Sequence, residues 1–206
     1  VHGETEWDSW QLDPRRITSF ANTEFTALKS IEDYQHEFVW HLPHEHRPAG
    51  RPAKASPLYP LPKAKGTAFG VVNGWERTEF SKHDPQLKPT HGYAFQNWHD
   101  VVGAEVAALR ENVGLAELSG FNHYRITGTD ALDWLASLTC SKVSAKTGRA
   151  SLCYFLTPKG NIAGEATLVP LPGGDIFYGS AATAEYHDMD WLTENLPKGS
   201  DIRIES

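Results

Sequence analysis

Four histidines lie close together in the first quarter of the sequence, and imidazole nitrogens are common ligands of zinc. They are His36, His41, His44 and His46. The segment around the last three is rich in proline and has no cysteine partner nearby. We therefore predict no metal site at this cluster.

Other residues of catalytic type lack the partners that catalysis needs. His99 and Asp100 are adjacent at a predicted helix start, where neighbouring side chains do not face each other, and Asp100 suits an N-cap. Ser119 and Cys153 have no recognisable base, so the sequence gives no support for nucleophilic catalysis. The run Gly173-Gly174-Asp175 is typical of a hairpin turn and not of a phosphate-binding loop.

The overall composition excludes several classes of protein. The chain has 206 residues and a formal net charge of −7, which disfavours binding to nucleic acid. No apolar run reaches the roughly 18–20 residues that span a bilayer, and no secretory signal is visible. The two cysteines, Cys140 and Cys153, form no disulfide framework, which indicates a reducing compartment. We expect a cytoplasmic protein, or one of the mitochondrial matrix in a eukaryote, with no membrane or nucleic-acid partner.

The first half of the chain alternates between one helix and irregular segments. Apolar residues recur at helical spacing from Thr18 to His36, with Thr18 or Ser19 as the predicted cap. Residues 41–66 contain eight prolines or glycines, which exclude a long helix or a central strand. We interpret them as an ordered connection, followed by a short strand from Phe69 to Trp75.

The second half shows strands interleaved with helices, including clear hairpins, and this pattern indicates an α+β fold with an antiparallel or mixed sheet. The predicted helices are 100–114, about 130–138 and 183–195, and the predicted strands are 124–127, 151–156, 162–171 and 176–179.

Four short motifs, taken in order, resemble the central segment of dimethylglycine and sarcosine dehydrogenases. They are Leu12-Asp13-Pro14-Arg15-Arg16, Glu45-His46-Arg47-Pro48-Ala49-Gly50-Arg51-Pro52, Ser56-Pro57-Leu58-Tyr59 and Gly74-Trp75-Glu76-Arg77. In that family the segment joins a FAD-binding amine-oxidase part to a folate-binding part. The resemblance implies that residues 1–80 form this connector.

From about Phe95 onwards the chain resembles the N-terminal half of the aminomethyltransferase fold of the glycine cleavage T-protein. Three motifs carry the likeness: Asn112 to Ser119, Ile126 to Ala131 and Leu156 to Gly160. The resemblance implies an incomplete aminomethyltransferase-like folate-binding domain over residues 81–206. No G-x-G-x-x-G fingerprint follows a strand, so we expect FAD in a part of the polypeptide that precedes this chain, which we interpret as a fragment inactive by itself.

The resemblance also implies a catalytic residue. The family has an acidic residue near the reacting folate nitrogen, in a pattern similar to G-x-I-x-x-D, and Glu165 takes that place in Gly160-Asn161-Ile162-Ala163-Gly164-Glu165. A carboxylate there stabilises a developing cation and relays a proton. Considered without the resemblance, Glu165 would belong to a solvated strand face.

The folate contacts are less complete. Leu152, Val169 and Ala181 stand where T-proteins have a tyrosine, a tyrosine and an asparagine. Tyr154 lies two residues after Leu152, so it faces the same side of a strand and supplies an aromatic surface. Phe121 stands where a methionine lines the folate pocket. For both aromatic residues, ordinary core packing is the alternative.

Three functions stay open at this point. In the first, the intact protein oxidises a methylated amine such as dimethylglycine or sarcosine and passes the one-carbon unit to tetrahydrofolate, with the flavin part as partner. In the second, the lobe binds folate without chemistry. In the third, it has lost its ligand and only packs against a neighbouring domain.

Glu76-Arg77 is either a contact for a substrate carboxylate or a surface ion pair.

Overall fold

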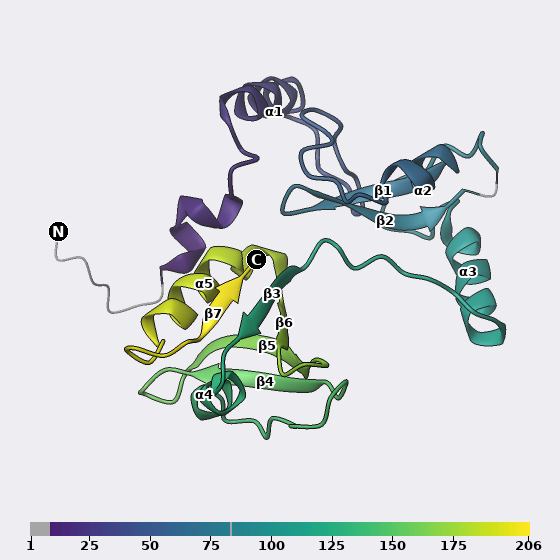
Figure 1. The fold of residues 1–206 in the computed structure, drawn as a ribbon. Coiled ribbons are helices and arrows are strands. Elements are labelled where there is room, and N and C mark those ends of the chain that lie inside the picture. The colour runs from purple at the N-terminus through teal and green to yellow at the C-terminus, as the bar shows by residue number, and fades with distance from the viewer. Residues whose placement is uncertain (1–8, 83) are drawn as a thin grey trace. The chain divides into compact units, whose positions relative to one another are not determined.

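The computed structural model describes residues 9–82 and 84–206. It divides the chain into two compact units (Figure 1). One unit comprises Ile17–Gly120, and the other comprises Phe121–Ser206 together with residues 9–16. We describe each unit separately.

The unit of residues 17–120 is built around a two-stranded hairpin. Its strands are β1 (Thr67–Val72) and β2 (Trp75–Ser81), which pair in antiparallel fashion. The turn between them is Asn73-Gly74, with φ angles of 50° and 79°. Positive φ at both positions suits the type I′ turn that Asn-Gly favours. The prediction of one strand from Phe69 to Trp75 was therefore wrong, because it ran through the turn.

The helices of this unit are α1 (Thr23–Gln35), α2 (Pro60–Ala64) and α3 (His99–Glu111).

Helix α1 begins later than predicted. Its N-cap is Asn22, whose side-chain oxygen accepts a hydrogen bond from the Phe25 amide at 2.9 Å. Thr18, the predicted cap, has a φ of 60° and lies outside the helix. An asparagine cap satisfies one of the free amides of the first turn.

The apolar stripe of α1 faces outward. Leu28, Ile31 and Tyr34 are exposed, whereas Glu32 is 6% exposed. The Glu32 carboxylate accepts hydrogen bonds from the Ala49 amide and from Lys29 Nζ, each at 2.7 Å. The helix is therefore held to its unit by the buried Glu32 carboxylate and by Phe25, whose ring packs edge-on against Phe20 at 5.2 Å.

The second unit contains a five-stranded sheet in the order β4-β5-β6-β3-β7, in which every neighbouring pair is antiparallel. This agrees with the α+β prediction. Its elements are η1 (Trp10–Leu12), η2 (Pro14–Ile17, which ends at the unit boundary), β3 (Asn122–Thr127), α4 (Ala131–Leu138), β4 (Ser151–Leu156), β5 (Ile162–Pro170), β6 (Ile176–Ser180), η3 (Ala182–Ala184), α5 (Glu185–Glu194) and β7 (Arg203–Glu205).

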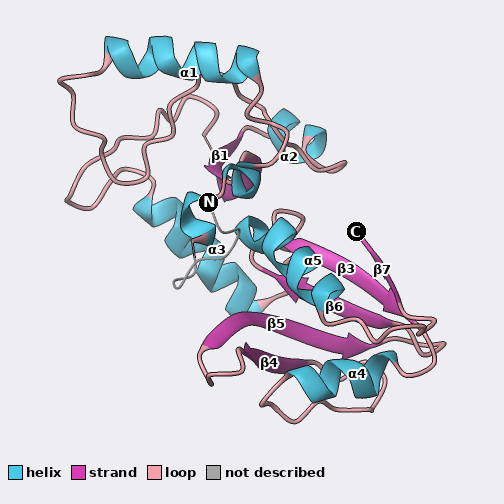
Figure 2. Ribbon diagram, turned by 90° about the vertical axis from the view of Figure 1, so that its left-hand side faces the viewer, coloured by secondary structure: helices cyan, strands magenta, loops and turns pink. Residues whose placement is uncertain are grey.

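One face of this sheet carries the core. A row of four directly paired residues crosses strands β3, β6, β5 and β4, and all four are buried: Tyr124, Tyr178, Leu168 and Ser151. Because side chains alternate along a strand, the residues two positions away share this face. Helices α4 and α5 pack against it (Figure 2), and the indole nitrogen of Trp134 bonds the Asn195 carbonyl.

Helix α5 buries one apolar and one acidic residue. Leu192 is fully buried, but Tyr186 is 39% exposed, and Asp188 takes an inward position instead. Its outer side contacts the N-terminal segment, where Arg15 pairs with Asp190 at 2.7 Å. Among the described residues, no helix combines the length and apolar content needed to cross a membrane.

Candidate functional site on the open face of the sheet

The face of the sheet opposite the core brings together two of the predicted site residues. Tyr154 of β4 pairs directly with Glu165 of β5. Both side chains point away from the core, because their strand neighbours Cys153 and Ala166 are buried. Directly opposed residues lie roughly 5 Å apart at Cβ, which is close enough for their polar ends to meet.

The Tyr154 phenol lies opposite the Glu165 carboxylate. The proximity and negative charge of that carboxylate raise the pKa of Tyr154 above its ordinary value. The phenol is therefore neutral at physiological pH and can donate a hydrogen bond that orients the carboxylate. An oriented carboxylate with a solvent-facing side can hold a cation or accept a proton.

This coupling predicts a change in titration. Replacing Glu165 by Gln removes the charge that opposes phenolate formation, so the pKa of Tyr154 is expected to fall towards the ordinary tyrosine value of about 10. NMR titration of ring-labelled tyrosine, with the resonance assigned by Tyr154→Phe, measures it. An unchanged Tyr154 pKa in Glu165→Gln would show that the two side chains do not interact in solution.

Phe121 lies on the same face but not beside the pair. It comes immediately before Asn122, the first residue of β3, which pairs with Ser180 of β6. Strand β3 is two strands away from β5, which carries Glu165. That separation is roughly 10 Å at ordinary strand spacing. Phe121 is 39% exposed, which is inconsistent with a packed core residue. It can therefore contribute a wall of a shallow site but cannot touch Tyr154 or Glu165.

Small residues on β6 and just after it lie between these two positions. Gly179 pairs with both His123 and Thr167, and Ala181 follows the strand. A Cβ at Gly179 would lie 2.8 Å from the Phe177 ring, so the glycine lets that ring lie close to the backbone. The Phe177 ring therefore covers Gly179. With the His123 ring, whose centroid lies 5.2 Å from it, it forms an aromatic surface between the acidic and aromatic ends of the face.

The three positions that depart from the T-protein pattern also belong to this face. Leu152 pairs with Thr167 and is 55% exposed. Val169 pairs with Phe177. Both point to the open side, because their strand neighbours Leu168 and Tyr178 are buried. Tyr154 and Leu152 share a side, as the two-residue spacing predicted.

A buried carboxylate beneath this face was missed by the sequence reasoning. Asp188 is 4% exposed and accepts a hydrogen bond from Ser180 Oγ at 2.5 Å, and Asn122 Nδ2 donates to the same Oγ at 3.0 Å. Its Oδ1 lies 3.7 Å from the position that a Cβ would take at Gly164, the residue before Glu165. Asp188 lies four residues before the buried Leu192, on the same side of helix α5. This spacing could have indicated that Asp188 is buried.

Glu76 is neither a surface residue nor a partner of the adjacent arginine. Its side chain is 2% exposed, and Arg51 binds it with two hydrogen bonds of 2.7 and 2.9 Å. These bonds raise the pKa of Arg51. The interpretation of Glu76-Arg77 as a surface ion pair was therefore wrong for Glu76. Its partner is the guanidinium group of Arg51, which lies 25 residues earlier in the sequence.

The histidine cluster is arranged for hydrogen bonding. His36 Nδ1 lies 2.7 Å from the Glu32 carbonyl oxygen, and His46 bonds through both ring nitrogens. Within residues 9–82 and 84–206, no group of three or more histidine, cysteine or acidic side chains is placed to hold a metal ion.

Comparison with known proteins places this geometry in a class. The glycine cleavage system aminomethyltransferase T from Bartonella henselae matches 73% of the chain with a TM-score of 0.52 at 18% identity, covering 37% of that structure. The fold is therefore that of the aminomethyltransferases. Residues 58–206 match the GCVT N-terminal domain, and residues 2–56 match the FAD dependent oxidoreductase central domain.

The chain belongs to the GCVT N-terminal domain family, joined to the central domain of a FAD-dependent oxidoreductase. Rat mitochondrial dimethylglycine dehydrogenase is 32% identical over 99% of the chain, and the mouse mitochondrial pyruvate dehydrogenase phosphatase regulatory subunit is 25% identical over 100% of the chain. The chain spans about a quarter of each relative, 24% in both cases. It is thus related to the flavin-linked demethylating dehydrogenases.

Proposed function

We propose that this chain is part of a flavin-linked dehydrogenase that oxidatively demethylates a methylated amine of the dimethylglycine or sarcosine type, and that its sheet unit directs the one-carbon unit to tetrahydrofolate. The observation that carries the proposal is the Tyr154–Glu165 pair on the open face. The resemblance of Gly160–Glu165 to the family pattern supports the assignment of Glu165 to the place of the family's acidic residue. The similarity to dimethylglycine dehydrogenase supports the amine class.

The open face fits a folate ring in its chemistry. Phe121 and Leu152 offer exposed apolar surface, the Phe177 ring over Gly179 offers an aromatic face, and Glu165 offers a carboxylate. Tetrahydrofolate, when bound, supplies the nucleophilic nitrogen that takes up the one-carbon unit. Glu165 then stabilises positive charge and accepts a proton at its carboxylate, while Tyr154 fixes the orientation of that carboxylate.

The flavin belongs elsewhere in this proposal. The sequence of 206 residues contains no glycine-rich dinucleotide fingerprint after a strand, so no residue here is assigned to FAD. The preceding polypeptide would hold the flavin and choose the amine. A mitochondrial matrix location is compatible with the mitochondrial relatives.

A product analysis of the full-length protein tests this proposal. With tetrahydrofolate present, Glu165→Gln is expected to divert carbon from methylene-tetrahydrofolate to free formaldehyde and to lower folate-linked transfer by about tenfold, because an exposed carboxylate contributes less than a buried one. Amine-dependent electron transfer should be unchanged. Glu194→Gln, which removes an exposed charge from the end of α5, is the matched control. Equal folate-linked transfer in both variants would exclude Glu165 from the reaction.

A second function rests on the similarity to a regulatory subunit. In this alternative the lobe binds folate, or packs against a neighbour, without doing chemistry. The replacement residues Leu152, Val169 and Ala181 favour it, because they remove polar contacts from the face. Folate binding by a full-length protein that shows no amine-dependent electron transfer would select this alternative.

A further inference from the structure

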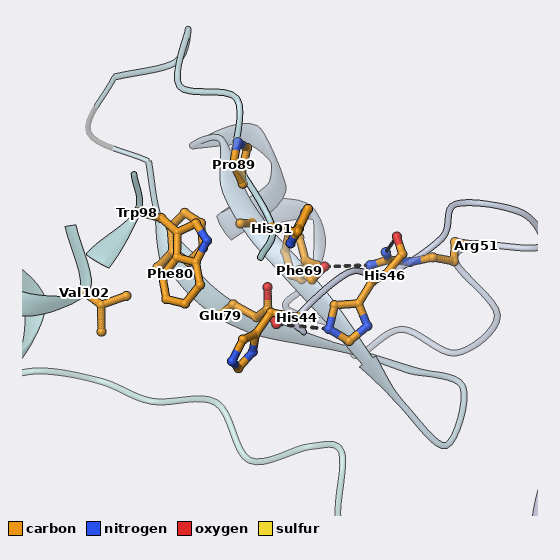
Figure 3. A pocket seen from close by; sticks show the side chains of 11 residues that line it. His44, His46, Arg51, Phe69, Glu79, Phe80, Pro89, His91, Trp98 and Val102 are labelled. Carbon is orange, nitrogen blue, oxygen red and sulfur yellow. Dashed lines mark hydrogen bonds and ion pairs between the residues drawn. The ribbon is translucent and has the colours of Figure 1, made fainter. Parts of the chain in front are cut away.

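A pocket of about 410 Å³ is lined entirely by residues of the unit of residues 17–120 and by none of the sheet unit. Its walls combine aromatic rings with imidazoles and one carboxylate (Figure 3). The side chains that the argument uses are His46, Arg51, Glu79, Phe80, His91 and Trp98.

The aromatic wall consists of two stacked rings. Phe80 is 5% exposed and stacks on Trp98, with ring centroids 5.6 Å apart and an interplanar angle of 14°. The indole nitrogen of Trp98 donates to the Thr90 carbonyl at 3.0 Å, which fixes the ring plane. His44 approaches the same indole edge-on at 5.4 Å, from a backbone with a φ of 58°. Such backbone strain in a non-glycine residue often accompanies a functional site.

The carboxylate of Glu79 faces this wall with a fixed partner. His46 Nδ1 accepts a hydrogen bond from the Val71 amide at 3.3 Å, so its Nε2 carries the proton and donates to Glu79 Oε1 at 3.1 Å. The pair lies over strand β1 at Gly70, where a Cβ would be 2.7 Å from Glu79 Oε1 and 2.8 Å from His46 Nε2. The glycine therefore leaves the space that this pair needs.

Arg51, the arginine of the pocket, already donates hydrogen bonds to other groups of the protein. Arg51 donates twice to Glu76, once to the Phe69 carbonyl and once to the His46 carbonyl. It has little left to offer an anion. Because Glu76 balances Arg51, the charge of Glu79 remains to face a ligand. His91 Nδ1 is buried without a hydrogen-bond partner, which leaves a polar atom for a ligand to satisfy.

We propose that this pocket binds a small alkylammonium cation. Aromatic faces attract such cations through their quadrupoles, and the methyl groups of the cation pack on the rings. Glu79 opposes the positive charge, and Phe80 and Trp98 form the apolar wall. This inference does not rest on the proposed folate chemistry, because it uses only residues of the other unit.

The test compares a cation with its neutral isostere. Choline and 3,3-dimethylbutan-1-ol have the same shape and differ in the charge of the central atom. We expect choline, titrated into the 206-residue chain and followed by NMR, to shift the indole resonance of Trp98 saturably, and the alcohol to bind at least fivefold more weakly.

Two variants and one control separate the effect of charge from the effect of geometry. Glu79→Gln keeps an acceptor for His46 and should weaken choline binding about fivefold, whereas Glu111→Gln, at the exposed end of α3, should leave it unchanged. Gly70→Ala keeps every charge but displaces the His46–Glu79 pair, and it should also weaken binding. Equal affinity for choline and the alcohol, tighter binding of acetate, or no saturable binding of choline to the unaltered chain would each overturn the proposal.

Discussion

Replacing Arg51 by Met is expected to destabilise the unit of residues 17–120 by about 3 kcal/mol. The change leaves the Glu76 carboxylate buried and without its counter-ion, and breaking a buried pair from one side typically costs that much. We take the lower end of the usual range because Arg51 is partly exposed. Hydrogen exchange of the β1 and β2 amides measures the loss, which should speed up their exchange roughly 100-fold.

Two controls make this result specific. The double variant Arg51→Met with Glu76→Leu should recover at least half of the loss, because no charge then remains buried. Arg125→Met removes the surface pair with Asp175 in the sheet unit and should change stability far less, since that arginine is solvent-exposed. If Arg51→Met and Arg125→Met destabilise their units equally, the Arg51–Glu76 pair is not a buried interaction in solution.

Replacing Leu135 by Ala is expected to destabilise the sheet unit by about 2–5 kcal/mol. Leu135 is fully buried in the core that α4 shares with the sheet, so the change removes apolar contacts and leaves a cavity. Urea denaturation followed by the fluorescence of Trp134 and Trp191, with the other tryptophans replaced, reports on this unit alone.

The matched control lies on the other side of the same sheet. Leu152→Ala shortens an equally large side chain that is 55% exposed on the open face, and the expected loss is under about 1 kcal/mol. Similar losses for the two leucines would mean that the open face is covered in solution. That outcome would contradict the placement of a ligand site there.

The regular elements of the sheet unit could be predicted because each signal was local. Strands 151–156 and 176–179 match β4 and β6 within a residue, since alternation and turn residues bound them. The pairing of Tyr154 with Glu165 was not predictable from spacing, because register depends on the turn between the strands. The two residues were nominated separately, and the fold brings them together.

The unit of residues 17–120 was harder to predict because its contacts are polar and distant in sequence. The Asn73-Gly74 turn was a strong hairpin signal that the interpretation overlooked. The apolar stripe of α1 suggested burial, yet Glu32 is the buried residue, because Ala49 and Lys29 satisfy it. Arg51 and Glu76 are 25 residues apart, so no local pattern links them. The division of the chain at residue 80 stays a prediction.

The most direct test of the central claim is calorimetric titration of tetrahydrofolate into the full-length protein and its Glu165→Gln variant, with Glu194→Gln as the control. The account predicts saturable binding to the unaltered protein and to Glu194→Gln, and markedly weaker or no binding to Glu165→Gln. Binding that is equal in all three proteins, or absent from all three, would contradict a folate site centred on Tyr154 and Glu165.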